Sequence, residues 1–291
     1  MTLCIGAICE QDDRPRIVLC SDWQQETPFA GGEVSDKLKW LDTDHKWAAL
    51  VADSVSRGFQ LVDTLRKHFK TKTSIGDDEI FSFLEAGLAL HKVRLSDEFF
   101  KLNYGVSFDE VLSNGSEGAQ RRFPDRFVEE SLQKLESVKF GAQVIVAGFA
   151  EGDVPALFII NEDPYSPNAT LLRRDENFAA IGSGAPSALM TLYRRKHIGT
   201  EISLLRAMYH LFEAMVMSGE VVPGVGKEDM SIDVLSPSGP PLSLSDSGYS
   251  YLSRRFDADF GPRSIGDRNR FNFSEKYVES FEFDWREKSE M

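Results

Sequence analysis

The chain has 291 residues, of which 42% are hydrophobic and 27% charged, so it can bury a substantial core as one large domain or two small ones. Acidic residues outnumber basic ones by 46 to 33, and the formal net charge is −13. This balance disfavours binding to nucleic acids or anionic membranes, which needs an excess of Lys and Arg. No run approaches the ~20 apolar residues of a membrane span, and no signal peptide is recognisable. We therefore expect a soluble, cytoplasmic protein.

The first 53 residues read as β structure. Apolar, β-branched runs at 3–9 and 17–20 are joined by a charged turn, and residues 37–41 and 47–52 are further strand candidates. All three cysteines, Cys4, Cys9 and Cys20, lie within or beside these runs. Because the number is odd and no Cys-x-x-Cys spacing occurs, a disulfide framework or zinc site is disfavoured, and we expect buried free thiols.

Helical patterns follow these strands. Apolar residues recur at three- and four-residue steps over residues 55–69 and again over 80–95, which predicts two amphipathic helices. Residues 104–121 contain Gly, Ser and Asn and are interpreted as a long loop. Pro124 then lies near the start of a third, more polar helix that runs to about residue 138.

The second half begins with β pattern and then alternates again. The predicted strands cover residues 142–149, 156–161, 170–173, 178–181 and, later, 231–235. Two helices are expected before the last strand, at about 186–196 and 201–218. Residues 236–291 are first rich in Pro, Ser and Gly and then charged and aromatic, and we interpret them as a partly ordered C-terminal extension of a domain spanning 1–235.

The order of these elements indicates the fold class. Helices occur in adjacent pairs between groups of strands, whereas a doubly wound parallel sheet places them singly between strands. The pattern predicts an α+β fold, specifically a four-layer αββα sandwich in which two antiparallel sheets pack face to face with helix pairs outside.

Common catalytic motifs are absent. The five histidines are scattered, and none belongs to a His-Glu-x-x-His motif. Residues 224–227 (Gly-Val-Gly-Lys) lack both the upstream glycine and the following Ser or Thr of a phosphate loop. Ser183 is flanked by Gly182 and Gly184 but lacks the outer glycine spacing of a hydrolase nucleophile elbow.

Thr2 follows the initiator Met directly and opens the first predicted strand. Because the Thr2 side chain is small, the Met1 that precedes it is well suited to removal. An N-terminal threonine carries a hydroxyl nucleophile and its own α-amino base, and an α-amino pKa of about 7.7–8.0 leaves a useful neutral fraction at pH 7. The alternative is an ordinary threonine, which is common at position two.

Asp22 and Lys37 are candidates to support such a nucleophile. Asp22 ends the second apolar run, where an unpaired carboxylate costs free energy, and Lys37 opens the next strand. A lysine held beside Thr2 would lower the pKa of its amine and ease removal of the hydroxyl proton. The alternative is a surface Asp and a surface Lys.

Eight short segments occur in an order that resembles proteasome subunits. They are residues 1–6 (Met-Thr-Leu-Cys-Ile-Gly), 17–22 (Ile-Val-Leu-Cys-Ser-Asp), 35–38 (Ser-Asp-Lys-Leu), 48–53 (Ala-Ala-Leu-Val-Ala-Asp), 144–149 (Val-Ile-Val-Ala-Gly-Phe), 155–158 (Pro-Ala-Leu-Phe), 178–184 (Phe-Ala-Ala-Ile-Gly-Ser-Gly) and 231–234 (Ser-Ile-Asp-Val). The opening Met-Thr-x-Cys is especially similar to the bacterial proteasome-like proteins called ancestral beta subunits. The resemblance covers about residues 2–68 and 140–235, and it depends on the shared order of the segments, since each is short.

This resemblance to a family of N-terminal-nucleophile hydrolases implies a role for each matching residue. Thr2 would be the nucleophile, with its amine as the base, and Asp22 and Lys37 would tune and orient it. Ser183 would hydrogen-bond near the amine and help to position a proton-shuttling water. Ala49 stands where active members usually have a glycine whose backbone N–H forms the oxyanion hole, and alanine can supply the same N–H.

Trp47 and residues 225–230 stand at two further positions that have a role in this family. Trp47 falls where members line the specificity pocket, and a core Trp on a strand is the alternative. Active members usually have an Asp and a Ser just before a Gly-Gly that precedes the late strand, but residues 225–230 read Val-Gly-Lys-Glu-Asp-Met. This departure, like Ala49, favours a catalytically silent subunit of the same fold.

The resemblance further implies hydrolysis of peptide or amide bonds through an acyl ester on Thr2, without a metal or organic cofactor. It implies a homo-oligomeric ring or open spiral that encloses the active sites and admits a peptide or protein substrate. The alternatives are a catalytically silent structural or interaction subunit of the same fold, and an amidase for a small molecule.

Overall fold

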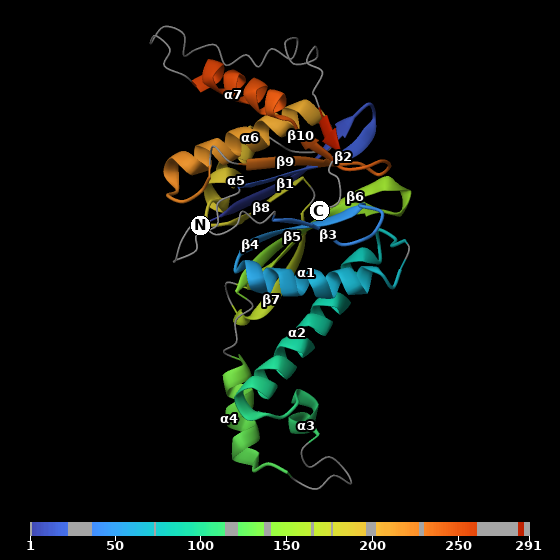
Figure 1. The fold of residues 1–291 in the computed structure, drawn as a ribbon, viewed down its shortest axis with the longest axis vertical. Coiled ribbons are helices and arrows are strands. Elements are labelled where there is room, and N and C mark those ends of the chain that lie inside the picture. Colours follow the sequence, from blue (N-terminus) through green and yellow to red (C-terminus); the bar gives the residue numbers. More distant parts are fainter. Residues whose placement is uncertain are drawn as a thin grey trace.

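The computed structural model describes residues 2–22, 37–72, 74–113, 122–136, 141–163, 166–175, 177–195, 202–226, 230–260 and 285–287. Within these ranges the chain is an α+β protein with two antiparallel sheets and seven α-helices (Figure 1). None of these helices combines the length and the apolarity that crossing a membrane requires.

The first sheet has six strands in the order β11-β10-β9-β2-β1-β8. Their bounds are β1 Leu3–Gln11, β2 Arg14–Asp22, β8 Phe178–Gly182, β9 Met230–Leu235, β10 Leu242–Leu244 and β11 Trp285–Glu287. β1 and β2 form a hairpin whose two turn residues, Asp12 and Asp13, have positive φ angles of 52° and 57°. Aspartate tolerates this conformation, and such a two-residue turn matches the twist of the paired strands.

The second sheet has five strands in the order β3-β4-β5-β6-β7. Their bounds are β3 Leu38–Trp40, β4 Trp47–Asp53, β5 Ala142–Ala150, β6 Val154–Asp163 and β7 Ser166–Asp175. A short 3₁₀ turn, Glu151–Asp153, joins β5 to β6. All of the strands predicted from apolar runs are present, although β7 is longer than its predicted segment.

Helices cover the outer face of each sheet (Figure 1). Their bounds are α1 Val55–Phe69, α2 Ile80–Tyr104, α3 Phe108–Leu112, α4 Asp125–Glu136, α5 Ala185–Arg194, α6 Leu204–Val221 and α7 Asp246–Phe260. α5 and α6 cover the first sheet and α1 covers the second. The far half of α2 extends away from the sheets, with α3 and α4 beside its end.

The predicted loop over residues 104–121 is wrong in its first half. α2 continues to Tyr104, and α3 follows almost at once. The reason is a capping box, in which the Ser107 side chain accepts from the Glu110 N–H and the Glu110 carboxylate accepts from the Ser107 N–H. Residues 114–121 lie outside the described residues.

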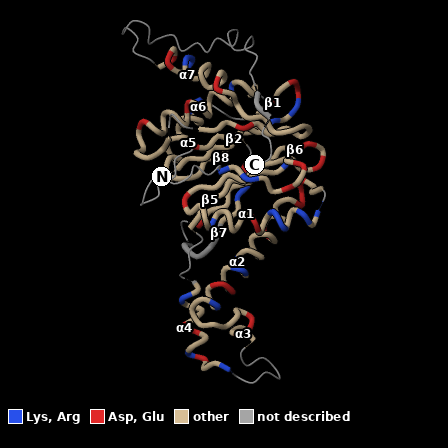
Figure 2. Tube along the Cα trace, viewed as in Figure 1, with Lys and Arg blue, Asp and Glu red and all other residues tan. Residues whose placement is uncertain are grey.

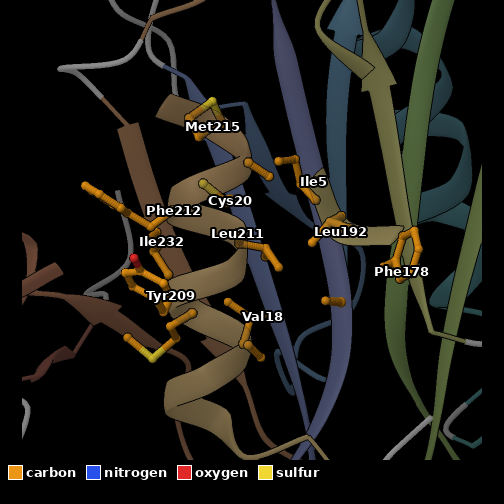
Figure 3. Packing of buried hydrophobic residues seen from close by; sticks show 14 of the residues in the cluster. Ile5, Val18, Cys20, Phe178, Leu192, Tyr209, Leu211, Phe212, Met215 and Ile232 are labelled. Carbon is orange, nitrogen blue, oxygen red and sulfur yellow. The ribbon is translucent and has the colours of Figure 1, made fainter. Parts of the chain in front are cut away.

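Strand alternation places apolar side chains on both faces of each sheet. On β1, Leu3, Ile5 and Ala7 pack against α5 and α6 (Figure 3), while Cys4 and Ile8 face the second sheet. Charged residues lie mainly on helices, turns and strand ends (Figure 2). The three cysteines are buried free thiols, which confirms that prediction.

Part of the predicted C-terminal extension is built into the first sheet. β10 pairs with β9, so that Leu242 lies opposite Val234. The Tyr249 hydroxyl on α7 accepts the Ile232 N–H at 2.5 Å, and the Tyr209 hydroxyl on α6 donates to Asp259 of α7 at 2.6 Å. These bonds hold α7 against α6 and β9.

Candidate active site

Thr2 lies just before the start of β1, which pairs with β2 on one side and with β8, the edge strand of the first sheet, on the other. The next residue, Leu3, pairs with Gly182 at the end of β8, and Cys4 pairs with Ser21, next to the end of β2. Thr2 is only 7% exposed. The fold therefore brings the ends of β2 and β8 to the residue that follows Met1.

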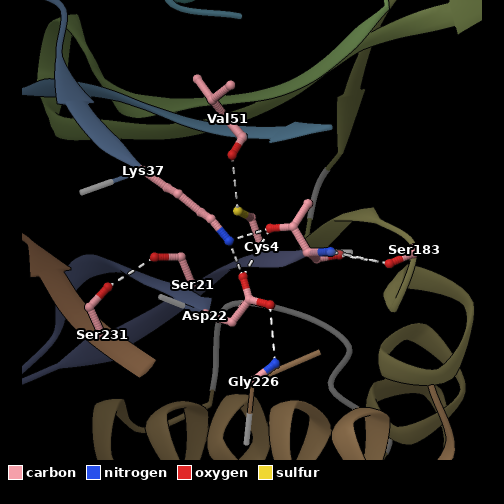
Figure 4. A network of polar contacts seen from close by, with 9 residues as sticks. Cys4, Ser21, Asp22, Lys37, Val51, Ser183, Gly226 and Ser231 are labelled. Carbon is pink, nitrogen blue, oxygen red and sulfur yellow. Dashed lines mark hydrogen bonds and ion pairs between the residues drawn. The ribbon is translucent and has the colours of Figure 1, made fainter. Parts of the chain in front are cut away.

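The Thr2 hydroxyl contacts a buried ion pair (Figure 4). Its Oγ1 donates to Asp22 Oδ1 at 2.9 Å, and Lys37 Nζ donates to both Thr2 Oγ1 and Asp22 Oδ1. Asp22 comes from the first sheet, whereas Lys37 immediately precedes β3 of the second sheet. The site thus forms where the two sheets meet.

Burying this ion pair costs free energy unless further hydrogen bonds complete its surroundings. Asp22 is 0% exposed and Lys37 2% exposed. Desolvating two such charges costs several kcal/mol per ion, and their attraction offsets this only when further hydrogen bonds complete the site. Asp22 Oδ2 has such a bond, from the Gly226 N–H at 3.3 Å. A buried charged cluster around a hydroxyl is weak evidence for stability and better evidence for chemistry.

Ser183 contacts the backbone of Thr2 on the other side. The Thr2 N–H donates to Ser183 Oγ at 3.2 Å, and Ser183 Oγ donates to the Thr2 carbonyl at 3.3 Å. The Gly184 N–H also points to that carbonyl, at 3.5 Å. Two protein segments far apart in sequence therefore hold Thr2 by its backbone and by its hydroxyl.

Gly182 permits this close approach. Its φ is +94°, and a Cβ added there would come within 2.2 Å of the Thr2 carbonyl oxygen. Only glycine adopts this backbone conformation without strain and leaves room for the neighbouring carbonyl. Residues 182–184 are a poor match to a hydrolase nucleophile elbow, but in the structure they contact the backbone of Thr2.

Cys4 is close to the site, but its thiol is unreactive. Its Sγ donates to the Val51 carbonyl at 3.6 Å. Burial raises the pKa of the Cys4 thiol to about 12, despite the opposing effect of Lys37. Since the thiolate is the reactive form, Cys4 remains an inert thiol at neutral pH.

The structure corrects the role expected for Ala49. The Val51 N–H bonds to the Lys37 carbonyl, and the Leu41 N–H bonds to the Trp47 carbonyl. Hydrogen-bonded pairs recur at every second residue of an antiparallel ladder, so Ala49, which lies opposite Lys39, belongs to the same set. The Ala49 N–H is therefore directed into the ladder with β3 and is not placed as an oxyanion donor.

Trp47 lies in the core between the second sheet and α1. Its side chain is 4% exposed, and its ring centroid is 5.5 Å from that of Phe69. The indole covers Gly148 on β5, where an added Cβ would come within 2.4 Å of the ring. This packing favours the alternative interpretation of Trp47 as a core residue over a place in a specificity pocket.

Three residues around the site were not predicted from the sequence, because they contribute backbone atoms or come from strands of the second sheet. Gly226 belongs to the stretch that departs from the family pattern, yet its N–H reaches Asp22; residues 227–229 lie outside the described residues. Gln143 accepts the Gly182 N–H at 3.2 Å and donates to Asp53 at 2.6 Å. The positive φ of Asp53, 65°, has no signature in sequence.

Of the residues predicted for the site, Thr2, Asp22, Lys37 and Ser183 lie together, and Ala49 and Trp47 do not join them. Among the described residues, no group of three or more His, Cys, Asp or Glu side chains is placed to hold a metal ion. The sequence matches no family model, and no curated protein is significantly similar to it.

Proposed function

We propose that this chain is an N-terminal threonine hydrolase that cleaves peptide or amide bonds, with Thr2 as the nucleophile once Met1 has been removed. The observation that carries the proposal is the contact of Thr2 Oγ1 with the buried pair of Asp22 and Lys37. The facing sheets with helices outside them fit a four-layer αββα sandwich, the architecture that the resemblance to proteasome-like proteins implies.

Removal of Met1 creates the base. While Met1 is attached, the Thr2 nitrogen is an amide and cannot accept a proton. A free α-amine has a pKa of about 7.7–8.0, so a neutral fraction is available near pH 7 to take the hydroxyl proton. The Lys37 ammonium group stabilises negative charge that develops on Oγ1, and Asp22 holds Lys37 in place. Ser183 Oγ orients the nitrogen.

The proposed reaction has two steps. Thr2 Oγ1 bonds to the substrate carbonyl carbon while the Thr2 α-amine takes up the hydroxyl proton. The substrate C–N bond then breaks, and this proton passes to the amine that leaves. Water then attacks the acyl ester, with the amine again accepting a proton. The C–O bond to Thr2 breaks, the acid product leaves, and the threonine hydroxyl is restored.

The intact mass of the purified protein, before and after reaction with a β-lactone or epoxyketone probe, tests the proposal. Loss of one Met and a single adduct on Thr2 are expected. Thr43→Ala, at an exposed threonine, is the matched control and should label like the wild type. Retained Met1, or a free Thr2 that never labels, would contradict the proposal and favour a catalytically silent structural subunit.

Substrate class and assembly remain parts of the same proposal. Turnover of peptide libraries against small-molecule amides separates a peptidase from an amidase. A homo-oligomeric ring or spiral predicts a molar mass that is a multiple of 32.7 kDa in light scattering. A monomer that hydrolyses peptides would contradict the enclosed oligomer but would leave the proposed reaction at Thr2 intact.

A further inference from the structure

Two side chains connect the second sheet to the segment that holds Thr2. Gln143 Nε2 donates to Asp53 Oδ2 at 2.6 Å, and Gln143 Oε1 accepts the Gly182 N–H at 3.2 Å. Asp53 ends β4 and Gln143 lies near the start of β5, whereas Gly182 ends β8 of the first sheet. The chain of contacts therefore crosses from one sheet to the other beside the site.

Gln143 occupies the end of an otherwise apolar row. On β5, Ile145, Ala147 and Phe149 face the first sheet, and strand alternation places Gln143 on the same face. At this position the amide has one donor and one acceptor directed to different sheets. An apolar residue would extend the core but would leave the Gly182 N–H without this partner.

Asp53 reaches Gln143 because its backbone leaves the strand conformation. Ala49 and Val51 face α1, and a regular strand would direct Asp53 to that side as well. Its φ of 65° breaks the alternation, and its carboxylate then bonds to Gln143. A left-handed conformation in a non-glycine residue costs free energy and persists where surrounding contacts hold it.

The other end of this chain of contacts is the Thr2 backbone. Gly182 lies so close to the Thr2 carbonyl that a Cβ would not fit, and the next two residues, Ser183 and Gly184, bond to Thr2. A shift of residues 182–184 would move the Ser183 hydroxyl relative to the Thr2 nitrogen. Misplacement by about 1 Å can cost 10²-fold in rate.

We propose that Gln143 and Asp53 are positioning residues, which hold residues 182–184 against Thr2 and so align the Thr2 nitrogen with its hydroxyl. The inference rests on the proposed function for its catalytic consequence, but the positioning itself can be measured without turnover. Asp53 is exposed and Gln143 partly so, hence their bond adds little to global stability.

The most specific test reverses the donor and the acceptor in the hydrogen bond between Gln143 and Asp53. Gln143→Ala removes both bonds, and Gln143→Glu keeps an acceptor for Gly182 but places a carboxylate against Asp53. Adding Asp53→Asn to Gln143→Glu restores a donor–acceptor pair in the opposite direction, and asparagine tolerates the positive φ. Gln133→Ala, at an exposed glutamine on α4, is the matched control.

We expect both single variants at Gln143 to lower kcat and the rate of probe labelling at Thr2 by about 10- to 100-fold. KM and the melting temperature should stay near wild type, and the double variant should recover most of the lost rate. Equal kcat in Gln143→Ala and wild type, or no recovery in the double variant, would overturn the proposal.

Amide hydrogen exchange separates this inference from the proposed function. The Gly182 amide, followed in peptides that cover residues 180–184, should exchange faster in Gln143→Ala, which removes its acceptor, and in Gln143→Glu, because repulsion by Asp53 moves the new carboxylate away from it. It should exchange slowly again in the double variant, even if the wild type never labels. Unchanged exchange would overturn the positioning role even in an active hydrolase. An inactive wild type with the expected exchange pattern would contradict only the proposed function.

Discussion

The ammonium nitrogen of Lys37 contacts the hydroxyl oxygen of Thr2 across 35 residues of sequence, and both side chains are buried. The two residues come from different sheets, so the contact exists only when the sheets pack face to face. Asp22 neutralises the cation and accepts the Thr2 hydroxyl proton as a hydrogen bond. The site therefore forms only when the two sheets have packed together.

Thr2→Ala should abolish the proposed turnover, by at least about 10⁴-fold, because it removes the proposed nucleophile. Its hydroxyl donates to Asp22 and accepts from Lys37, and both of these groups are charged and buried, so the free energy of unfolding should fall by about 1.5–3 kcal/mol. Turnover assays and chemical denaturation check both values. Activity equal to that of the Thr43→Ala control would refute the assignment of Thr2.

Lys37→Ala should abolish the proposed activity and lower the free energy of unfolding by about 3–5 kcal/mol, because Asp22 is left buried without its cation. Lys46→Ala, at an exposed lysine close in sequence, should change it by less than about 0.5 kcal/mol. Combining Lys37→Met with Asp22→Asn removes both charges and should recover stability without activity. A stable, active Lys37→Ala protein would show that the pair is neither buried nor catalytic.

Gly182→Ala should lower the free energy of unfolding by about 2–4 kcal/mol, because it adds both backbone strain and a collision with the Thr2 carbonyl. Gly152→Ala is a matched control with a similar φ of +76° but open space around it, and it should cost about 1 kcal/mol. Denaturation of both variants, with probe labelling of Thr2, gives the measurement. Similar costs in the two variants would rule out the close approach at Gly182.

The cysteines should resist alkylation in the native protein. Burial raises the pKa of Cys4 and Cys9 to about 12 and that of Cys20 well above its usual value. A pKa raised in this way leaves about one thiolate in 10⁴ at pH 8, so iodoacetamide should add nothing detectable by mass, whereas the unfolded chain should take up three adducts. A native adduct on Cys4 would mean that electrophilic probes can report on a thiol instead of Thr2.

The sequence determined the elements and the candidates whose signals are local. Apolar periodicity over five to fifteen residues depends only on backbone geometry, so the strands β1 to β9 and the helices α1, α2, α4, α5 and α6 were predictable, including the buried run of β4. α3, β10, α7 and β11 were not predicted. Thr2, Asp22, Lys37 and Ser183 were also identifiable, because a chemically unusual position or an ordered motif marks each one. The capping box of α3 was present in the sequence at Ser107 and Glu110, but glycine and serine around it favoured a loop.

Only the tertiary structure decided which backbone groups face the site. Whether the Ala49 N–H points to Thr2 or into a ladder depends on the register of β3 and β4, and register arises from strand pairing, not from the identity of one residue. The Gly226 N–H meets Asp22 across 204 residues, and Gln143 meets Gly182 across 39. Every residue except proline carries the same backbone N–H, so its use at a site leaves no mark in the sequence, whereas a threonine hydroxyl or a lysine ammonium does.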